Sequence, residues 1–392
     1  MRIAQVCLRF LAPGGVESHV YNLSKELHKK GHEVQIFTTN LYTEKPWKLI
    51  DYPDPVLEFA KINRYRVYKD LIPFLKMPIA PALLKGILEY SPDIVHLHSH
   101  RYFHVILGSL LTAKYPVVVS THYHPPEQKE TMWARAMLNF QDLLFKAFVY
   151  NQVEAVISHE GEIESMRNFL GGVNSYVIPA GIDPEEYKIA PNEEGFRNAY
   201  NLEGEYIIYA GRLASNKGLL YLLKAFASIE KKMHVKLVLM GEESGYGEVL
   251  KRLINEYSIK NVIFTGFVKE RDLYLGGIKG SSLFVLPSEW EAFGISVIEA
   301  YMMSRPVITS DRGGLKYLGK IGGHVVPYGD VKALSEAIVK ILTNKKESFI
   351  KAEKAKEYVL SHYTWNIVAN EVESVYKKVV NQYGRKHAIN GY

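Results

Sequence analysis

The stretch Ile3-Ala-Gln-Val-Cys-Leu-Arg-Phe10 decides the fold, together with the residues that follow it up to Thr38. Its apolar side chains indicate a strand, and a Gly14-Gly15 turn comes after it. Apolar residues then recur at helical spacing until Gly31, where a glycine is typical of a helix end. A second strand-like run closes at Thr38. Strand, helix and strand in this order predict a βαβ unit of a parallel sheet.

Short runs rich in Val and Ile alternate with helical periodicity along the rest of the chain. The further expected strands are residues 94–98, 117–120, 155–158 and 176–178 in the first half and 206–210, 236–240, 262–265, 283–286 and 306–309 in the second. Such alternation predicts an α/β fold with two Rossmann-like, doubly wound domains. Ligands of these sheets bind at the carboxyl ends of the strands, so the expected site is the cleft between the halves.

The chain of 392 residues is too long for one ordinary core, and its length favours two domains. Prolines, glycines and charged residues over residues 179–195 are typical of a linker. We expect an N-terminal domain over residues 1–188 and a C-terminal domain over residues 189–363. The last predicted helix, within residues 364–392, is expected to cross back onto the N-terminal domain, although a simple C-terminal cap fits the same pattern.

Composition excludes several classes of protein. No segment approaches the roughly 18 uncharged apolar residues that a membrane span needs, and the N-terminus lacks the pattern of a secretory signal. Cys7 is the single cysteine, which excludes an intrachain disulfide and a thiolate metal cluster. We expect a cytoplasmic protein in which Cys7 is a buried, inert thiol.

The net charge of +6 lies entirely in the second half of the chain. Residues 186–392 hold 29 Lys and Arg against 23 Asp and Glu, whereas residues 1–185 are balanced. Much of the excess falls in runs such as residues 351–356, which are typical of solvated helix faces. Because the charge is not concentrated on one element, we expect no nucleic-acid partner.

Two cations follow the predicted strand that ends at Ala210. The segment Gly211-Arg-Leu-Ala-Ser-Asn-Lys-Gly218 places Arg212 and Lys217 five residues apart at the carboxyl end of that strand. A guanidinium fork and an ammonium suit a diphosphate, and both could neutralise charge that develops on a leaving phosphate. Surface charges beside a turn would give the same pattern, so this pair is weak evidence when taken alone.

The segment Pro287-Ser-Glu-Trp-Glu-Ala-Phe-Gly-Ile-Ser-Val-Ile-Glu-Ala300 is more informative. It predicts a strand-to-helix turn at Phe293-Gly294-Ile295, where free backbone N–H groups could bind phosphate or sugar oxygens. Glu291 would lie in the loop and Glu299 about one turn inside the helix. Glu299 is expected among apolar side chains, where a carboxylate needs a partner.

With these residues in view, the chain resembles the retaining glycosyltransferases called family 4, whose fold is called GT-B. The resemblance covers nearly the whole chain. Its pieces occur in order: Gly14-Gly15 with Val16 and His19, Ser120-Thr-His-Tyr-His124, Ile178-Pro-Ala-Gly-Ile-Asp183, Gly211-Arg212 with Lys217-Gly218, Thr265-Gly-Phe267, the Glu291 to Glu299 segment, and residues 322–330.

This resemblance implies a hexosyltransferase that takes its sugar from a UDP-, GDP- or ADP-sugar and keeps the anomeric configuration. Arg212 and Lys217 would hold the diphosphate, Glu299 the ribose and Glu291 the transferred sugar, and His122 would touch the sugar or the acceptor at the reacting end. The remaining expected donor contacts are Gly14, Gly15, Gly241, Phe267, Phe293, Gly294 and Ile295. In this family the two cations replace a metal, so neither a metal nor a cofactor is expected.

Six histidines are dense enough to raise the question of a metal site: His96, His98, His100, His104, His122 and His124. We do not expect zinc here. The alternating His96 and His98 either line the acceptor side of the cleft or pack in the core, and His122 too could be a core histidine.

One residue departs from the family pattern. The family commonly has a glutamate three residues after Gly314, where this chain has Tyr317.

Two other functions stay open: a sugar-nucleotide 2-epimerase, which shares the two-domain fold and needs no acceptor, and a sugar-nucleotide binder that has lost catalysis.

The acceptor is not encoded in these motifs, and a glycan, a lipid-linked molecule or a small soluble molecule would all fit. Residues 61–90 and 132–149 are apolar and aromatic enough for a lipid-facing surface and peripheral membrane contact. Core-packing helices explain the same composition, and we favour core packing for both segments.

Overall fold

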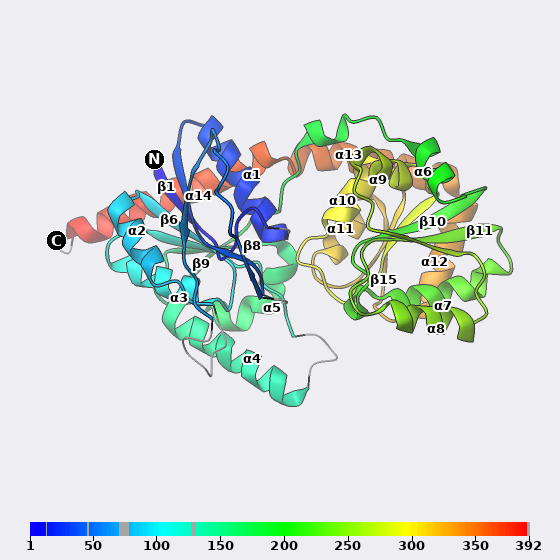
Figure 1. Ribbon diagram of the computed structural model, residues 1–392, viewed down its shortest axis with the longest axis horizontal. Helices are drawn as coiled ribbons and strands as arrows, with labels where there is room; N and C mark the ends of the chain where they lie inside the picture. The colour runs from blue at the N-terminus through cyan, green and yellow to red at the C-terminus, as the bar shows by residue number, and fades with distance from the viewer. Residues whose placement is uncertain (13, 45–46, 70–77, 127–130, 390–392) are drawn as a thin grey trace. The chain divides into compact units, whose positions relative to one another are not determined.

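The computed structural model describes residues 1–12, 14–44, 47–69, 78–126 and 131–389 (Figure 1). The chain forms two compact units. The first consists of Met1–Gly181 together with Trp365–Tyr392, and the second of Ile182–Thr364. Each unit is built around its own parallel sheet, which confirms the predicted α/β class with two Rossmann-like domains.

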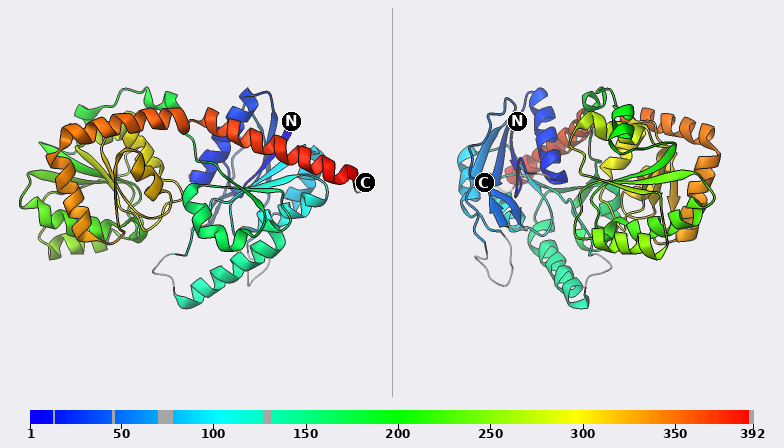
Figure 2. Two further views of the ribbon diagram at one scale, coloured as in Figure 1. Left: turned by 180° about the vertical axis from the view of Figure 1, so that it is seen from behind. Right: turned by 45° about the vertical axis from the view of Figure 1, so that its right-hand side comes forward.

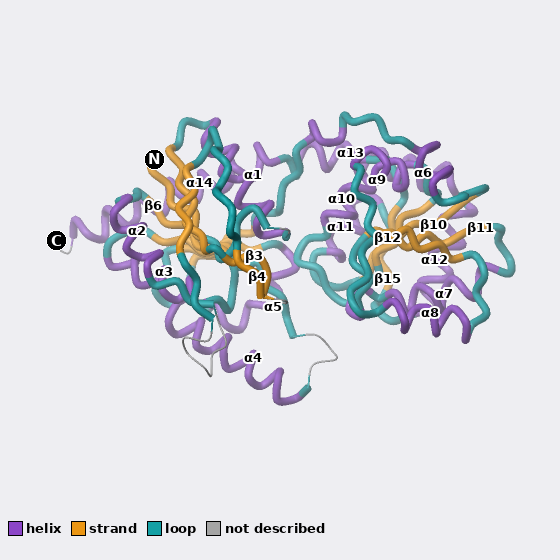
Figure 3. Tube along the Cα trace, viewed as in Figure 1, coloured by secondary structure: helices purple, strands orange, loops and turns teal. Residues whose placement is uncertain are grey.

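The first unit contains a seven-stranded sheet of order β5-β2-β1-β6-β7-β8-β9, in which every neighbouring pair is parallel. Figure 3 shows its strands in orange and the surrounding helices in purple. The strands are β1 Arg2–Val6, β2 Glu33–Thr39, β5 Lys61–Tyr65, β6 Ile94–His98, β7 Val117–Ser120, β8 Ala155–Ser158 and β9 Asn174–Val177. A small antiparallel pair, β3 Leu41–Glu44 and β4 Trp47–Leu49, follows β2. The strand order reverses between β1 and β6, so their carboxyl ends border the expected ligand site.

Helices cover both faces of this sheet. They are α1 Gly15–Lys29, α2 Ala82–Tyr90, α3 Phe103–Ser109, α4 Met132–Phe145, α5 Glu160–Leu170 and α14 Trp365–Ile389, with short helical turns at Leu110–Ala113 and Lys146–Tyr150. One apolar core contains α1 and α14, and the other contains α2, α3, α5 and the end of α4. The C-terminal helix α14 thus packs on the first unit, beside α1 (Figure 2).

The second unit has a six-stranded parallel sheet of order β12-β11-β10-β13-β14-β15. Its strands are β10 Glu205–Ala210, β11 Val235–Met240, β12 Val262–Gly266, β13 Leu283–Leu286, β14 Val307–Ser310 and β15 His324–Val326. Its helices are α6 Glu193–Ala199, α7 Leu219–Glu230, α8 Gly247–Glu256, α9 Arg271–Lys279, α10 Ile295–Met302, α11 Leu315–Gly322, α12 Val331–Thr343 and α13 Lys345–His362, with short turns at Pro184–Tyr187 and Ser215–Lys217. The order reverses between β10 and β13, which brings the loops after these strands together.

Two expectations about the first unit are wrong. No strand is expected between residues 39 and 93, yet the edge strand β5 lies there, and its Asn63 amide donates to Gln35 of β2 at 2.9 Å. Its composition hides it, because Lys, Asn and Arg are unusual in a strand of this kind. Core packing also fails for α4, one side of which exposes large apolar residues. Leu71, Phe74, Leu75 and Met77, the centre of the other apolar segment, lie outside the described residues.

Among the described residues, no helix is long and apolar enough to cross a bilayer. Cys7 is fully buried, and burial raises the pKa of its thiol to about 12, so it stays protonated at neutral pH.

Candidate active site

Loops after four strands of the second unit carry the residues expected to hold a donor. Arg212 follows β10, Gly241 follows β11, Phe267 follows β12 and Glu291 follows β13. The strands β12, β11, β10 and β13 are consecutive neighbours in the sheet. Because all are parallel, these loops leave the same edge of the sheet side by side.

Lys217 and Glu291 form an ion pair. The Lys217 ammonium donates to Glu291 Oε1 at 2.6 Å, and the Ser288 hydroxyl donates to the same oxygen at 2.9 Å. Gly218 sets the position of the lysine: its φ is +68°, and a Cβ there would lie 1.9 Å from the carbonyl oxygen of Pro287. The loops after β10 and β13 can approach this closely only with glycine at that point.

Arg212 is exposed, and its backbone rather than its side chain is fixed. Its carbonyl oxygen accepts a hydrogen bond from the buried Tyr209 hydroxyl at 2.7 Å. The amide of Leu213 donates to the backbone carbonyl oxygen of Glu242 at 2.8 Å, which links the same loop to the segment after Gly241. The guanidinium therefore projects from an anchored backbone into solvent, where an anion can reach it.

Glu299 is buried, and each of its carboxylate oxygens accepts one hydrogen bond. Only 7% of it is exposed, and it lies in α10 among Val297, Ile298 and Ala300. Arg271 donates to its Oε1 at 2.7 Å and the Tyr274 hydroxyl to its Oε2 at 2.6 Å, both from α9. Burial and then the carboxylate raise the pKa of Tyr274 well above its usual value, so the phenol stays a donor.

The residues Arg271, Tyr274 and Ser288 were missed by the sequence reasoning. Arg271 and Tyr274 lie outside every recognised motif, and their link to Glu299 depends on the packing of α9 against α10. Ser288 could have been noticed, because it lies three residues before Glu291 in the same loop.

The N-terminus of α10 is open. Gly294 occupies the N-cap with φ of +107°, no side chain of the described residues caps the helix, and its first turn holds no acidic residue. The Val297 N–H donates to the carbonyl oxygen of Gly294 at 3.0 Å. The N–H groups of Ile295 and Ser296, next to the loop that carries Glu291, are therefore the ones that a ligand could reach. Phe293 is buried, Ile295 is half exposed at 42%, and Phe267 is 72% exposed after β12.

Residues of the loop after β14 hold the loop that carries Glu291 in place. The amide of Gly314 donates to the carbonyl oxygen of Glu291 at 2.8 Å. A Cβ on Gly313 would lie 2.2 Å from that same oxygen, so this approach also requires glycine. Tyr317, the departure from the family pattern, is partly buried in α11.

The first unit carries the remaining expected residues. Gly14 and Gly15 lie at the N-terminus of α1, after the loop that follows β1, and among the described residues no side chain caps this helix. A Cβ on Gly14 would lie 2.0 Å from Glu17, whose carboxylate is already paired with Arg9 at 2.8 Å. Gly15 faces open space, so its backbone can be approached by a ligand.

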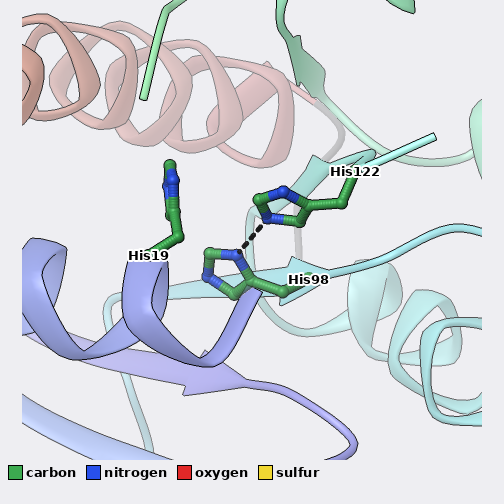
Figure 4. Close-up of side chains that lie close together, drawn as sticks. All are labelled: His19, His98 and His122. Atoms are coloured by element: carbon green, nitrogen blue, oxygen red, sulfur yellow. Dashed lines mark hydrogen bonds between the residues drawn. The ribbon is translucent and has the colours of Figure 1, made fainter. Parts of the chain in front are cut away.

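His122 belongs to a group of three histidines shown in Figure 4, His19 from α1, His98 from β6 and His122 from the loop after β7. The His98 Nδ1 and His122 Nε2 atoms lie 3.3 Å apart in a hydrogen bond. His122 has φ of +41°, a strained value for a residue with a Cβ, and such strain is concentrated at functional sites. His19 is 5% exposed, and in the described part of the chain neither of its ring nitrogens has a hydrogen-bond partner.

A buried network sets the proton positions on these rings. The Gln5 amide donates to the Tyr376 hydroxyl at 3.1 Å, so its carbonyl oxygen accepts from His98 Nε2 at 2.6 Å. A neutral imidazole has one proton, and His98 Nδ1 therefore accepts from His122 Nε2. In this assignment His122 Nδ1 is left as a hydrogen-bond acceptor.

Burial keeps these imidazoles uncharged. It lowers the pKa of His122 well below the usual value, with His159 and His96 adding to the effect, and it does the same for His19 and His98. His124 is exposed, whereas His96 is bonded to Tyr376 and Ser120 and His100 to Tyr150 and Asp142. His104 is buried too, and its Nε2 bonds to the carbonyl oxygen of His98 at 2.8 Å.

The same three histidines are the group among the described residues that could hold a metal ion. Their candidate ligand nitrogens all lie within 4.8 Å of one another, and neutral imidazole is the form that binds zinc. However, His98 and His122 already satisfy each other with a single shared proton. The three histidines could therefore either bind a cation or, with the His98–His122 hydrogen bond kept, make polar contacts to a substrate.

Comparisons with known proteins agree with this architecture. The pattern of the Glycosyltransferase Family 4 domain matches residues 13–186, and that of Glycosyl transferases group 1 matches residues 192–359. The chain is 24% identical to a phosphatidyl-myo-inositol mannosyltransferase of Mycobacterium leprae over 97% of both chains. It is 26% identical to an uncharacterised glycosyltransferase of Methanocaldococcus jannaschii over 98% of this chain and 100% of the relative.

Solved structures share the fold. Sucrose-phosphate synthase from Thermosynechococcus elongatus superimposes with a TM-score of 0.75 at 21% identity, over 97% of this chain and 99% of that one. Anabaena HepE in complex with UDP and glucose gives a TM-score of 0.73 at 17% identity, over 96% and 100%. The two family patterns together span most of the chain, and the protein belongs to the family 4 glycosyltransferases of the GT-B fold.

Proposed function

We propose that this glycosyltransferase moves a hexose from a nucleoside diphosphate sugar to an acceptor hydroxyl, with retention of the anomeric configuration and without a metal. The observation that carries this proposal is the cluster at one sheet edge of the second unit. An exposed guanidinium, a lysine–glutamate pair and an uncapped helix N-terminus converge there. This set offers cationic and N–H donors for a diphosphate and carboxylates for sugar hydroxyls.

In this proposal, donor binding exchanges partners at Lys217. The ammonium now neutralises Glu291, and an arriving diphosphate would take it over. Glu291 would then be released to accept hydrogen bonds from the hydroxyls of the sugar, while Ser288 still holds one of its oxygens. The binding of phosphate and the readiness of the sugar site would thereby be coupled.

Glu299 would receive the ribose hydroxyls, with Arg271 and Tyr274 keeping its carboxylate in place. The base would lie towards Gly241 and Phe267, the residues after β11 and β12. HepE has been solved with UDP and glucose, which supports a nucleoside diphosphate donor here, whether UDP, GDP or ADP.

The acceptor oxygen would attack the anomeric carbon from the face that the diphosphate leaves. As the new C–O bond forms, the bond to the phosphate oxygen breaks, and the acceptor proton passes to that departing oxygen. No side chain then needs to be a strong base, so Arg212 and Lys217 contribute mainly by stabilising the growing phosphate charge. The neutral His122, with Nδ1 as an acceptor, would orient the sugar or the acceptor hydroxyl.

The acceptor itself is a glycan, a lipid-linked molecule or a small molecule. The name of the mycobacterial relatives, phosphatidyl-myo-inositol mannosyltransferase, supports a lipid-linked hydroxyl among these. We further propose a cytoplasmic location, with which a single buried cysteine is in keeping.

A panel of UDP-, GDP- and ADP-sugars tests the proposal through thermal unfolding. One nucleotide class should raise the melting temperature in a saturable manner in the presence of EDTA, because ligand binding stabilises the folded state. No stabilisation by any member would contradict the proposal. Conversion of a UDP-N-acetyl sugar to its 2-epimer without an acceptor would identify an isomerase instead, and binding without turnover towards any acceptor would identify a binder.

A further inference from the structure

The helix α4 and its continuation to Tyr150 expose an unusual amount of apolar surface. We define the apolar face of α4 as Met132, Trp133, Met137, Phe140, Leu143 and Phe148, whose exposed fractions range from 54% to 82%. Large aromatic and thioether side chains seldom lie together in water without a partner. Figures 1 and 2 show α4 along the outside of the first unit, away from its sheet.

The other side of α4 is firmly attached to the first unit. Phe145, Val149 and Tyr150 are buried in its core. Asp142 receives hydrogen bonds from His100 at 2.8 Å and from both Arg101 Nε at 2.6 Å and Arg101 Nη2 at 2.8 Å. The apolar face is therefore held outward by a packed and salt-bridged inner face.

The surface charge of α4 and its continuation is positive. Among residues 131–150 the acidic side chain is Asp142, which is buried and neutralised by Arg101. Of the two cations, Arg135 is exposed, whereas Lys146 is half-buried and its ammonium donates to the carbonyl oxygen of Asn168 at 3.5 Å. The two cations are eleven positions apart, which is about three helical turns, so both lie along the same flank of the apolar face. An apolar face with Trp and Phe and a cationic flank is the pattern of a helix that lies in a membrane interface.

We propose that the apolar face of α4 docks the protein onto an anionic bilayer surface. The helix is about 21 Å long, too short to span a bilayer, and would lie parallel to its plane. Trp133 and Phe140 would enter the boundary of the acyl chains, and Arg135 and Lys146 would contact lipid phosphates. If the apolar faces of two copies packed together, Arg135 and Lys146 of both copies would be brought close to one another, and the helix has no exposed carboxylate to offset their charge. This arrangement favours a bilayer over a second copy. This inference goes beyond the transfer reaction and stands without it.

Vesicle co-sedimentation tests the proposal with the full chain. At low salt, vesicles that mix phosphatidylglycerol with phosphatidylcholine should bind at least tenfold more tightly than phosphatidylcholine alone. Phe140→Glu should weaken binding to the anionic vesicles tenfold or more. Leu110→Glu is the matched control in the same unit, since Leu110 and Phe140 are 61% and 59% exposed, and it should stay within twofold of the wild type.

Fluorescence locates the contact. Anionic vesicles should shift the tryptophan emission to the blue, and Trp133→Phe should remove most of the shift while binding persists. Without vesicles, the melting temperature of Phe140→Glu should match that of the wild type, which reports a folded protein independently of membranes and of the donor. Absence of wild-type binding to anionic vesicles, equal binding by Phe140→Glu, or a vesicle-independent dimer that Phe140→Glu dissociates would overturn the proposal.

Discussion

At the residue scale, the Lys217 ammonium binds Glu291, and in the proposed reaction the donor diphosphate would compete with Glu291 for it. Its ammonium is 2.6 Å from Glu291 Oε1, and its side chain is largely buried. A partly desolvated cation at a strand end attracts a phosphate more strongly than an exposed one does. Its partner therefore has to be released when the phosphate arrives, and Ser288 keeps that partner in place.

We predict that Lys217→Ala and Arg212→Ala each lower turnover about a hundredfold, equivalent to roughly 3 kcal/mol of charge stabilisation in the transition state. Steady-state kinetics with saturating donor measure the effect. Lys351→Ala is the control, because Lys351 forms an ion pair with Glu347 on α13 at 2.6 Å. Wild-type turnover in both site variants would remove these residues from the mechanism.

Glu299 should act on donor binding rather than on the chemical step. Glu299→Gln keeps the size of the side chain but removes the charge that accepts from ribose, so the donor KM should rise about tenfold or more with a smaller change in kcat. Tyr274→Phe removes one of the two hydrogen bonds that hold Glu299 and should raise KM less. A normal donor KM in Glu299→Gln would exclude the ribose role.

Sequence reasoning recognised these residues unevenly. The Glu291 to Glu299 segment is local in the chain, and its strand, loop and helix are enough to predict which residues lie in the loop and which in the helix. The pairing of Lys217 with Glu291 and of Arg271 with Glu299 joins distant segments, and nothing in the spacing of the residues encodes it. The network of Gln5, His98 and Tyr376 has the same origin, because α14 returns to the first unit.

At the scale of elements, the N-terminus of α10 depends on one glycine. Gly294 has φ of +107°, and a Cβ there would lie 2.8 Å from Leu315 Cδ2. The helix can therefore begin beside α11 and present its first N–H groups only if this position lacks a side chain.

Gly294→Ala should destabilise the second unit by about 1–2 kcal/mol because of backbone strain. In calorimetry this corresponds to a melting temperature lower by about 2–8 °C. Stabilisation by the donor should decrease as well, since the first turn of α10 moves. Gly172→Ala, in open space and without a positive φ, should change neither quantity. A Gly294→Ala protein with normal stability and donor response would show that the turn is not needed.

The parallel strands were largely predictable because buried strands of an α/β sheet are continuous apolar runs. The edge strand β5 escaped prediction, since one of its sides lacks a neighbouring strand and it carries polar residues. Whether the apolar side of α4 faces the core or the solvent could not be predicted either. Apolar periodicity specifies an amphipathic helix, yet it does not tell whether the apolar face is covered.

At the scale of the whole molecule, buried histidines link the stability of the first unit to pH. Burial lowers the pKa of His96 to about 3 and that of His104 to about 4. In the unfolded chain a histidine titrates near pH 6.5, so the unfolded state binds more protons between about pH 4 and 6.5. The free energy of unfolding therefore falls as the pH decreases through this window.

Each such histidine should contribute a slope of up to about 1.4 kcal/mol per pH unit. His104→Gln retains a donor to the carbonyl oxygen of His98 and removes one titrating group, so its stability should fall less steeply than that of the wild type. Denaturant unfolding of the first unit at a series of pH values measures the two slopes. Parallel curves for wild type and variant from pH 6.5 to 4 would contradict this account.

The two units divide the predicted tasks. The second unit contains all the expected diphosphate cations and both carboxylates, whereas the first contains His122 and the apolar face of α4. Donor binding and membrane docking, as proposed, can therefore be altered separately, by Lys217→Ala in one unit and Phe140→Glu in the other.

The most direct test is the configuration of the first product formed from the stabilising donor. Proton NMR, recorded at early times in EDTA, follows the sugar that is transferred to an acceptor or slowly released to water. We predict the anomeric configuration of the donor, unchanged activity in EDTA, and loss of product with Lys217→Ala. An inverted product, or activity that EDTA removes and a divalent cation restores, would contradict a retaining transfer without a metal.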